Sequence, residues 1–125
     1  MSPQTTGRSG VRMASLDQFD LEDLTILKLR GSLNAEGIAQ VEADFNKATG
    51  RQGARVVVDL TSVDMVTTPA ISMFIAAANT VRASGGRLIF TESPPPVHDI
   101  LRRLRLHSVL ETVCGLQEAI DRIRR

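Results

Sequence analysis

The sequence predicts an α/β protein with a mixed, mainly parallel β-sheet packed with about four α-helices. Short apolar runs alternate with segments of helical spacing in the order ββαβαβαβα. Such alternation, with short connections, is typical of parallel sheets covered by helices. The run Val56–Val58 is β-branched and apolar throughout, as in a strand buried on both faces. No internal repeat or interdomain linker is visible, so one domain is expected.

Composition excludes several classes of protein. The chain has 125 residues, of which 42% are hydrophobic and 23% charged, as in a globular domain with a core. Its net charge of +1 and its lack of Trp and Tyr give no support for binding to nucleic acid or an anionic membrane. Cys114 is the only cysteine, so we expect an inert buried thiol, no disulfide, no metal and no cofactor. No apolar run reaches the roughly 18 residues that span a bilayer, and a cytoplasmic protein is expected.

The N-terminal part is expected to form a leader, a hairpin and a helix. Residues 1–14 are polar and rich in Gly and Ser, which predicts a disordered leader before a domain over residues 15–125. Leu16–Leu21 and Leu24–Arg30 are predicted strands joined by a tight turn. The segment Gly31–Asn34 should end the second strand, with Asn34 as N-cap of the first helix. That helix is expected to end near Gly50 and to bury the residues at helical spacing: Ile38, Val41, Phe45 and Ala48.

The central part is predicted to be a strand, a loop and an apolar helix. The strand covers Arg55–Asp59, and the helix is expected to start with Thr68 as N-cap and Pro69 at the first helical position. It should end at Ser84–Gly86. The side chains expected to face the sheet are Ile71, Phe74, Ile75, Ala78 and Val81. The opposite arc carries no charge, which indicates a cover formed either by the chain's own helices or by a partner protein: Ser72, Met73, Ala76, Ala77 and Thr80.

The C-terminal part is predicted to add two strands and two helices. Arg87–Thr91 and Val109–Val113 are the strands. The first helix begins at Pro94–Pro96, with Val97, Ile100, Leu101 and Leu104 expected to face inward. The closing helix has its apolar side chains at helical spacing: Leu116, Ala119, Ile120 and Ile123.

No motif indicates catalysis. His98 and His107 are not near a nucleophile elbow, and Gly85-Gly86 lacks the Lys and Ser or Thr of a P-loop. A phosphate site at the start of the central helix is disfavoured because Pro69 removes one N–H donor. The basic residues Arg102, Arg103 and Arg105 are interpreted as a solvated helix face. We therefore expect a protein that is not an enzyme.

Several segments together resemble the STAS domain family of anti-sigma factor antagonists and their relatives. They are the strand end Gly31–Asn34, the run Val56–Val63, Gly85–Leu88 and the segment Val97–Leu110. The resemblance covers Leu16 to the C-terminus and implies a STAS-like fold. It also implies a non-catalytic protein–protein interaction module whose partner is an anti-sigma factor or a serine kinase-type regulator, with a homodimer also conceivable.

In this family a serine at the start of the second helix accepts phosphate from the partner kinase. The matching position here is Pro69, which has no hydroxyl, and Thr68 and Thr67 are the candidate substitutes. The partner-binding residues that the resemblance and the uncharged arc suggest are Asn34, Thr67, Thr68, Pro69, Ala70, Ser72, Met73, Ala76 and Ala77. Two alternatives stay open: an accessory STAS subunit of a membrane transport complex of the lipid or ABC type, and a nucleotide-binding STAS domain.

Overall fold

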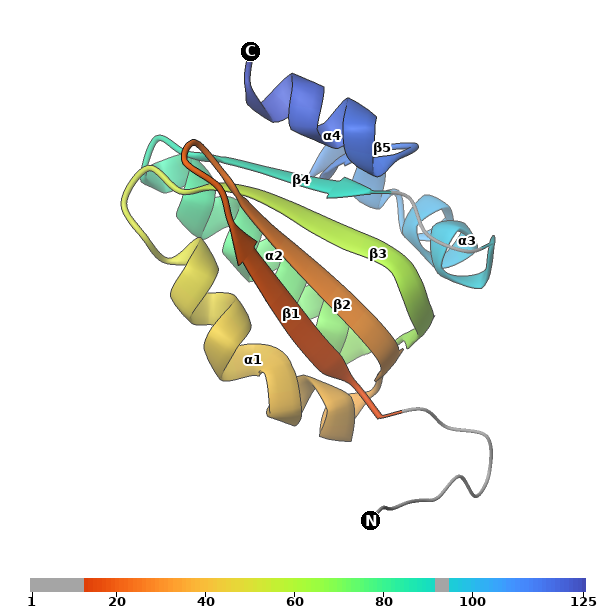
Figure 1. Ribbon diagram of the computed structural model, residues 1–125. Helices are drawn as coiled ribbons and strands as arrows, with labels where there is room; N and C mark the ends of the chain where they lie inside the picture. The colour runs from red at the N-terminus through yellow and green to blue at the C-terminus, as the bar shows by residue number, and fades with distance from the viewer. Residues whose placement is uncertain (1–12, 92–94) are drawn as a thin grey trace.

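The computed structural model describes residues 13–91 and 95–125 and contains one five-stranded sheet. The strands are β1 (Ser15–Asp20), β2 (Thr25–Leu33), β3 (Arg55–Val66), β4 (Arg87–Thr91) and β5 (Glu111–Val113). They lie side by side in chain order, β1-β2-β3-β4-β5. Only the β1–β2 pair is antiparallel. The predicted mixed, mainly parallel sheet is therefore confirmed (Figure 1).

Helices cover the two faces of this sheet unequally. The long helices α1 (Ala35–Thr49) and α2 (Thr68–Ala83) pack together on one face. The short helix α4 (Leu116–Ile123) lies on the other face, over β3 and β4 (Figure 1). Helix α3 (Pro95–Arg103) packs against β3, and the 3-10 turn η2 (Leu106–Ser108) follows it.

The core has one apolar cluster on each face, because side chains of β3 alternate between them. On the face of α1 and α2, the Phe74 ring lies 5.9 Å from that of Phe45 and 4.9 Å from that of Phe90, measured between centroids. Both arrangements are tilted, as aromatic pairs prefer. The second cluster, beneath α4, contains Leu24, Val57, Ile89, Val113, Ala119 and Ile123.

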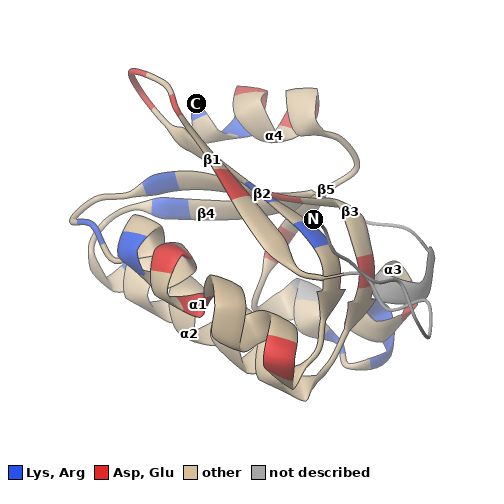
Figure 2. Cartoon of the chain, turned by 60° about the horizontal axis from the view of Figure 1, so that its bottom comes forward, with Lys and Arg blue, Asp and Glu red and all other residues tan. Residues whose placement is uncertain are grey.

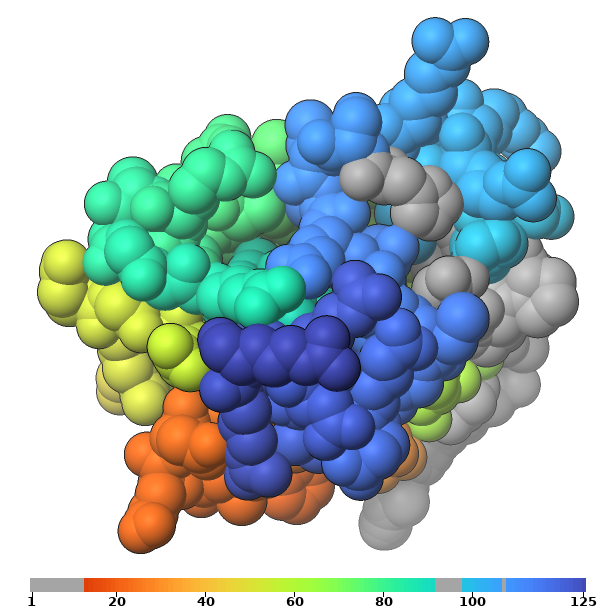
Figure 3. Space-filling model, turned by 90° about the horizontal axis from the view of Figure 1, so that it is seen from above, coloured from red at the N-terminus to blue at the C-terminus, as the bar shows by residue number. Residues whose placement is uncertain are grey.

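Helix α4 is held at its C-terminal end by arginines of the sheet. The Arg55 guanidinium donates to the Ile123 carbonyl at 2.9 Å, and Arg87 donates to the Arg122 carbonyl at 2.7 Å. Both carbonyls lie in the last turn of α4, where positive charge is favourable because of the helix dipole. Arg124 also pairs with Asp23 in the β1–β2 turn at 2.7 Å. Seen from above, α4 accordingly lies beside the β1–β2 hairpin (Figure 3).

The Asp23–Arg124 pair makes the contact between α4 and the hairpin dependent on pH. The hydrogen bond from Arg124 holds the pKa of Asp23 below its ordinary value of 3.8. The folded chain thus binds fewer protons here than the unfolded chain, so the pair stabilises the fold above pH 3.8 and is lost as pH falls through the lowered pKa. An NMR titration of the Asp23 carboxyl should give a lower midpoint in the wild type than in Arg124→Gln. Equal midpoints would contradict the pairing.

A buried carboxylate lies where the pairing of β3 with β4 ends. Asp59 Oδ1 accepts bonds from the Thr61 N–H at 3.0 Å, the Thr61 hydroxyl at 2.7 Å and the Thr91 hydroxyl at 3.2 Å. Here β3 advances from Asp59 to Ser62 while β2 advances only from Lys28 to Arg30, which is a bulge. The registered β3–β4 pairs end at Val58. Beyond the bulge, β3 continues with β2 as a ribbon that leads to α2.

The structure corrects several predicted boundaries. Strand β2 continues through Gly31 to Leu33, and β3 continues to Val66, where we expected loops. Ala14, assigned to the leader, is buried in the core. Strand β5 starts at Glu111, so the predicted Val109–Val113 was too long.

Two side chains also differ from expectation, and some predictions cannot be compared. Leu104, expected to face inward, is exposed directly after α3, and Cys114, expected to be buried, is exposed directly after β5. The helix start at Pro94, the side chains of Val97 and His107, and leader residues 1–12 lie outside the described residues.

Candidate functional site

The starts of α1 and α2 lie side by side at one end of the sheet. Leu33, the last residue of β2, is in register with Val66, the last residue of β3. Thr67 donates both its hydroxyl, at 2.8 Å, and its N–H, at 3.2 Å, to the Leu33 carbonyl. The two loops that sequence analysis singled out, at Asn34 and at Thr67, are therefore brought together. Both follow the carboxyl ends of parallel strands, where α/β proteins usually place functional residues.

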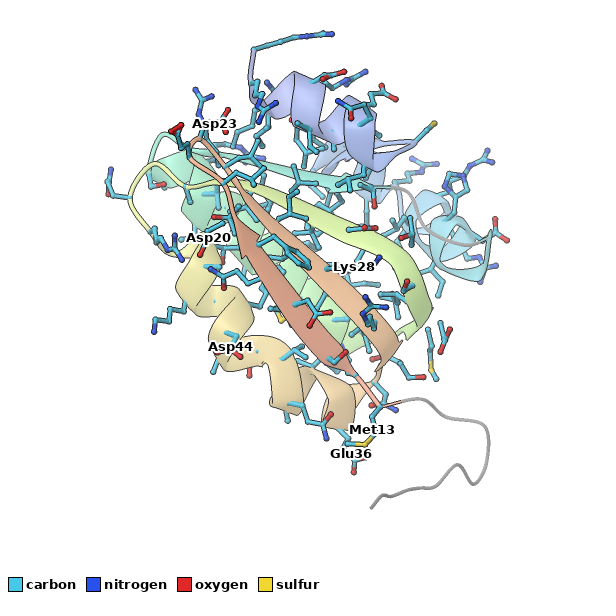
Figure 4. The ribbon with its side chains drawn as sticks, viewed as in Figure 1. Met13, Asp20, Asp23, Lys28, Glu36 and Asp44 are labelled. Atoms are coloured by element: carbon cyan, nitrogen blue, oxygen red, sulfur yellow. The ribbon has the colours of Figure 1, made fainter. Side chains whose placement is uncertain are left out.

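The start of α1 is tightly fixed. The Asn34 side chain accepts a hydrogen bond from the Gly37 N–H at 2.8 Å, which confirms the predicted N-cap. Gly37 itself packs so closely that a Cβ would collide with the Ser32 carbonyl oxygen and lie 2.9 Å from the Ala14 Cβ. A pocket of about 160 Å³ adjoins this point, with Met13 and Glu36 at its rim (Figure 4).

The start of α2 differs from the prediction by one residue. The N-cap is Thr67, in extended conformation, and Thr68 is already helical. The Thr67 side chain makes no capping bond, because its hydroxyl is directed to Leu33. An N-cap oxygen normally accepts from the second or third helical N–H, and the second helical residue is Pro69, which has none.

Sequence analysis placed the exposed face of α2 incorrectly. Ala70, Met73 and Ala77, expected in the partner-binding arc, are buried in the core at 0%, 5% and 4% exposure. Ile71 and Ile75, expected to face the sheet, are only half-buried. The helix is therefore rotated relative to the prediction. The chain's own elements cover Met73 and Ala77, so these two side chains are not accessible to a partner.

Arg82 and Ala83 are exposed in the last turn of α2. The exposed residues before them, which we call the outer face, are Thr68, Pro69, Ser72, Ala76, Asn79 and Thr80. They extend over most of the helix without a charged side chain (Figure 2). Ile71, Ile75 and Ala78 border them, half-buried against the core. Sequence analysis had assigned all three to the side of the helix that faces the sheet. An uncharged, small-residue face with an apolar margin is suited to close contact with another protein.

The site offers little for chemistry. Over residues 13–91 and 95–125, no group of His, Cys, Asp or Glu is arranged to hold a metal ion. The N–H groups of Ala70 and Ile71 already donate to the Thr67 carbonyl at 3.0 and 3.1 Å, and Pro69 has none to offer an anion. Of the two candidate phosphoacceptors, Thr68 is exposed while the half-buried Thr67 hydroxyl is engaged with Leu33. Thr68 is thus the more accessible hydroxyl.

Comparison with known proteins gives one family and a set of similar folds. A family model described as "Mlab, STAS domain" matches residues 18–112. An anti-sigma factor antagonist from Mycobacterium paratuberculosis is similar in structure, with TM-score 0.82, 12% identity and coverage of 90% of this chain and 95% of that chain. A STAS domain protein from Planctomyces limnophilus has TM-score 0.78 and 16% identity, over 88% and 98% of the two chains.

A third similar structure is the Bacillus anti-sigma factor antagonist SpoIIAA in its unphosphorylated form. Its TM-score is 0.73 at 17% identity, over 88% of this chain and 96% of that chain. Identities this low show a shared fold, which agrees with the predicted STAS-like α/β architecture. No curated protein sequence matches the chain. In the described residues, no helix is both long enough and apolar enough to cross a bilayer.

Proposed function

The chain belongs to the STAS domain family, whose model matches most of its length, and we propose that it is a non-catalytic cytoplasmic module that binds a regulatory protein. The proposed partner is an anti-sigma factor or a serine kinase-type regulator, as the similarity to anti-sigma factor antagonists suggests. The observation that carries this proposal is the uncharged outer face of α2 beside the joined helix starts at Asn34 and Thr67.

The physical case for this surface is that contact with a partner would remove it from water at little cost in free energy. Ser72 and Ala76 are small, so a partner backbone can approach closely, and neither carries a charge to desolvate. The half-buried Ile71 and Ile75 would complete their burial in such a contact. Asn34, Thr67 and Thr68 would form a polar rim at one end. Ala70, Met73 and Ala77 support this surface from below and take no part in contact.

We expect the contact to depend on the outer face. A Ser72→Glu/Ala76→Glu double variant places two exposed carboxylates there and should weaken partner binding at least about tenfold, because they would be desolvated in the complex. Its stability should change by less than about 0.5 kcal/mol per exposed site. The test is affinity purification from the native cell, with mass spectrometry and comparison against a Glu42→Lys variant on α1.

The identity of the retained protein separates the candidate functions. An anti-sigma factor or kinase-type protein that the double variant fails to retain would support the proposal. A transport ATPase in its place would favour an accessory subunit of a transport complex. Retention of the same partner by the double variant would remove the outer face from the interface.

We expect phosphorylation at the start of α2 to be absent or weak. Pro69 has no hydroxyl, and the Thr67 hydroxyl would have to break its 2.8 Å bond to Leu33 to accept phosphate. The exposed Thr68 lies one residue before the family's acceptor position and directly before Pro69, which restricts the backbone that a kinase would have to bind. Incubation with the co-purified kinase and ATP, followed by mass spectrometry, should therefore leave α2 unmodified, with Thr68→Val as the control. Stoichiometric phosphate on Thr68 would show that the switch has moved rather than disappeared.

A further inference from the structure

The end of α3 and the turn that follows it carry three arginines that have no side-chain partner among the described residues. Arg102, Arg103 and Arg105 are exposed, and none makes an ion pair or side-chain hydrogen bond to another described residue. Several other arginines on the described surface are paired, as in Arg30–Asp17, Arg87–Glu111 and Arg124–Asp23. Basic residues accordingly gather around the end of α3 (Figure 2). The nearby Asp99 is exposed, and no ion pair joins it to these arginines.

Two aliphatic side chains are exposed at the same turn. Leu104 is 54% exposed, although it was expected to face inward, and Val109 is 43% exposed. Between them, Arg105 has left-handed backbone dihedrals, φ 56° and ψ 36°, which are unfavourable for a residue other than Gly. The Ser108 hydroxyl, donating to the Arg105 carbonyl at 3.0 Å, helps to hold this conformation. We call Arg102, Arg103, Leu104, Arg105 and Val109 the basic corner.

We propose that the basic corner is a docking site for an acidic protein segment that carries an apolar residue between its carboxylates. Arginine suits this role because its planar guanidinium can bind a carboxylate through two parallel hydrogen bonds. All three basic residues here are arginines. Leu104 and Val109 supply the apolar contact, and strained backbone at a surface turn is a feature of recognition sites. Charge complementarity therefore defines the occupant.

An anionic membrane fits the basic corner less well. Even a single acyl chain gives only reversible membrane binding, and stable anchoring takes a second signal. Three arginine charges with one exposed leucine and one exposed valine would bind a membrane more weakly than a single acyl chain does. A protein segment can instead match each guanidinium with its own carboxylate.

This site is separate from the proposed partner surface. Helix α3 packs against β3 and η2, and the basic corner shares no residue with the outer face of α2. The inference therefore goes beyond the proposed function and can be tested without the native partner.

The test measures binding of a fluorescein-labelled peptide of Glu-Glu-Leu repeats to the full chain, by fluorescence anisotropy at several salt concentrations. The Arg102→Gln/Arg103→Gln double variant leaves the left-handed Arg105 unchanged. We expect it to bind the peptide at least about tenfold more weakly, and its affinity should depend less steeply on salt concentration. Leu104→Ser should weaken binding while keeping the salt dependence. Arg82→Gln, at the end of α2, is the matched control and should bind as the wild type does.

Three results would overturn the proposal. The first is equal binding of the peptide by the wild type and the double variant. The second is binding to phosphatidylserine vesicles that the double variant loses, while the peptide does not bind. The third is self-association of the chain in sedimentation that the double variant abolishes, because the occupant would then be a second copy.

Discussion

A Met73→Asp variant is expected to lose its cooperative fold. Met73 is 5% exposed and packs in the core with Phe74 and Ala77, on the side of α2 that faces away from solvent. Removing a buried methionine typically costs about 2–5 kcal/mol, and a buried carboxyl without a partner adds about 1–3 kcal/mol. That sum approaches the whole stability of a domain of this size, about 5–15 kcal/mol. Urea unfolding followed by circular dichroism would measure it.

Two controls make this result specific. Met73→Leu keeps the volume and should cost less than about 1.5 kcal/mol. Ser72→Asp, at the neighbouring exposed position, should be within about 0.5 kcal/mol of the wild type. A folded Met73→Asp chain that binds no partner would instead place Met73 on the interface, as the sequence alone had suggested.

Gly37→Ala should destabilise the chain even though alanine is the better helix former. Gly37 lies in the first turn of α1, where replacement of glycine would ordinarily gain up to about 1 kcal/mol. Its Cβ, however, would collide with the Ser32 carbonyl oxygen, which belongs to the backbone of β2 and cannot turn aside. We expect a net loss of about 1–3 kcal/mol, as for other overpacked sites. Thermal unfolding would give the sign.

The same variant tests how α1 supports the binding surface. If α1 moves away from β2, the Asn34 cap is disturbed and partner binding should weaken along with stability. Gly115→Ala is the control for steric collision, because a Cβ there would meet nothing within 4 Å. Gly115 is the N-cap of α4, where glycine is preferred to alanine, so this variant should lose at most about 1 kcal/mol of stability and should bind the partner as the wild type does. Increased stability of Gly37→Ala would contradict the close packing described for this position.

The sequence carries clear signals where one local interaction decides the structure. Asn34 followed by a helical apolar pattern identified the start of α1, and its cap is present at 2.8 Å. The run Val56–Val58 identified the central strand, because a strand covered on both faces needs no alternation. The strand and helix order followed from such segments, and with it the fold.

The sequence is ambiguous where long-range contacts decide. In α2, apolar or small residues occur on nearly every side, so Ile71 and Ile75 looked as suitable for the core as Met73 and Ala77. Packing of α1 against α2 selected the second pair. The extension of β3 beyond Asp59 is paired with β2, for example Val66 with Leu33, which lies far away along the chain. Polar residues such as Thr61 and Ser62 therefore looked like a loop.

The order of the strands has a consequence for synthesis on the ribosome. Because β1 to β5 lie side by side in chain order, each emerging strand can join the free edge of the sheet already made, and no strand has to be inserted between two others. The face beneath α4 is different, since Leu24, Val57 and Ile89 stay uncovered until the last residues arrive. A nascent chain stalled before α4 would therefore expose an apolar surface that is prone to aggregation, and we expect chaperones to bind it most at that stage.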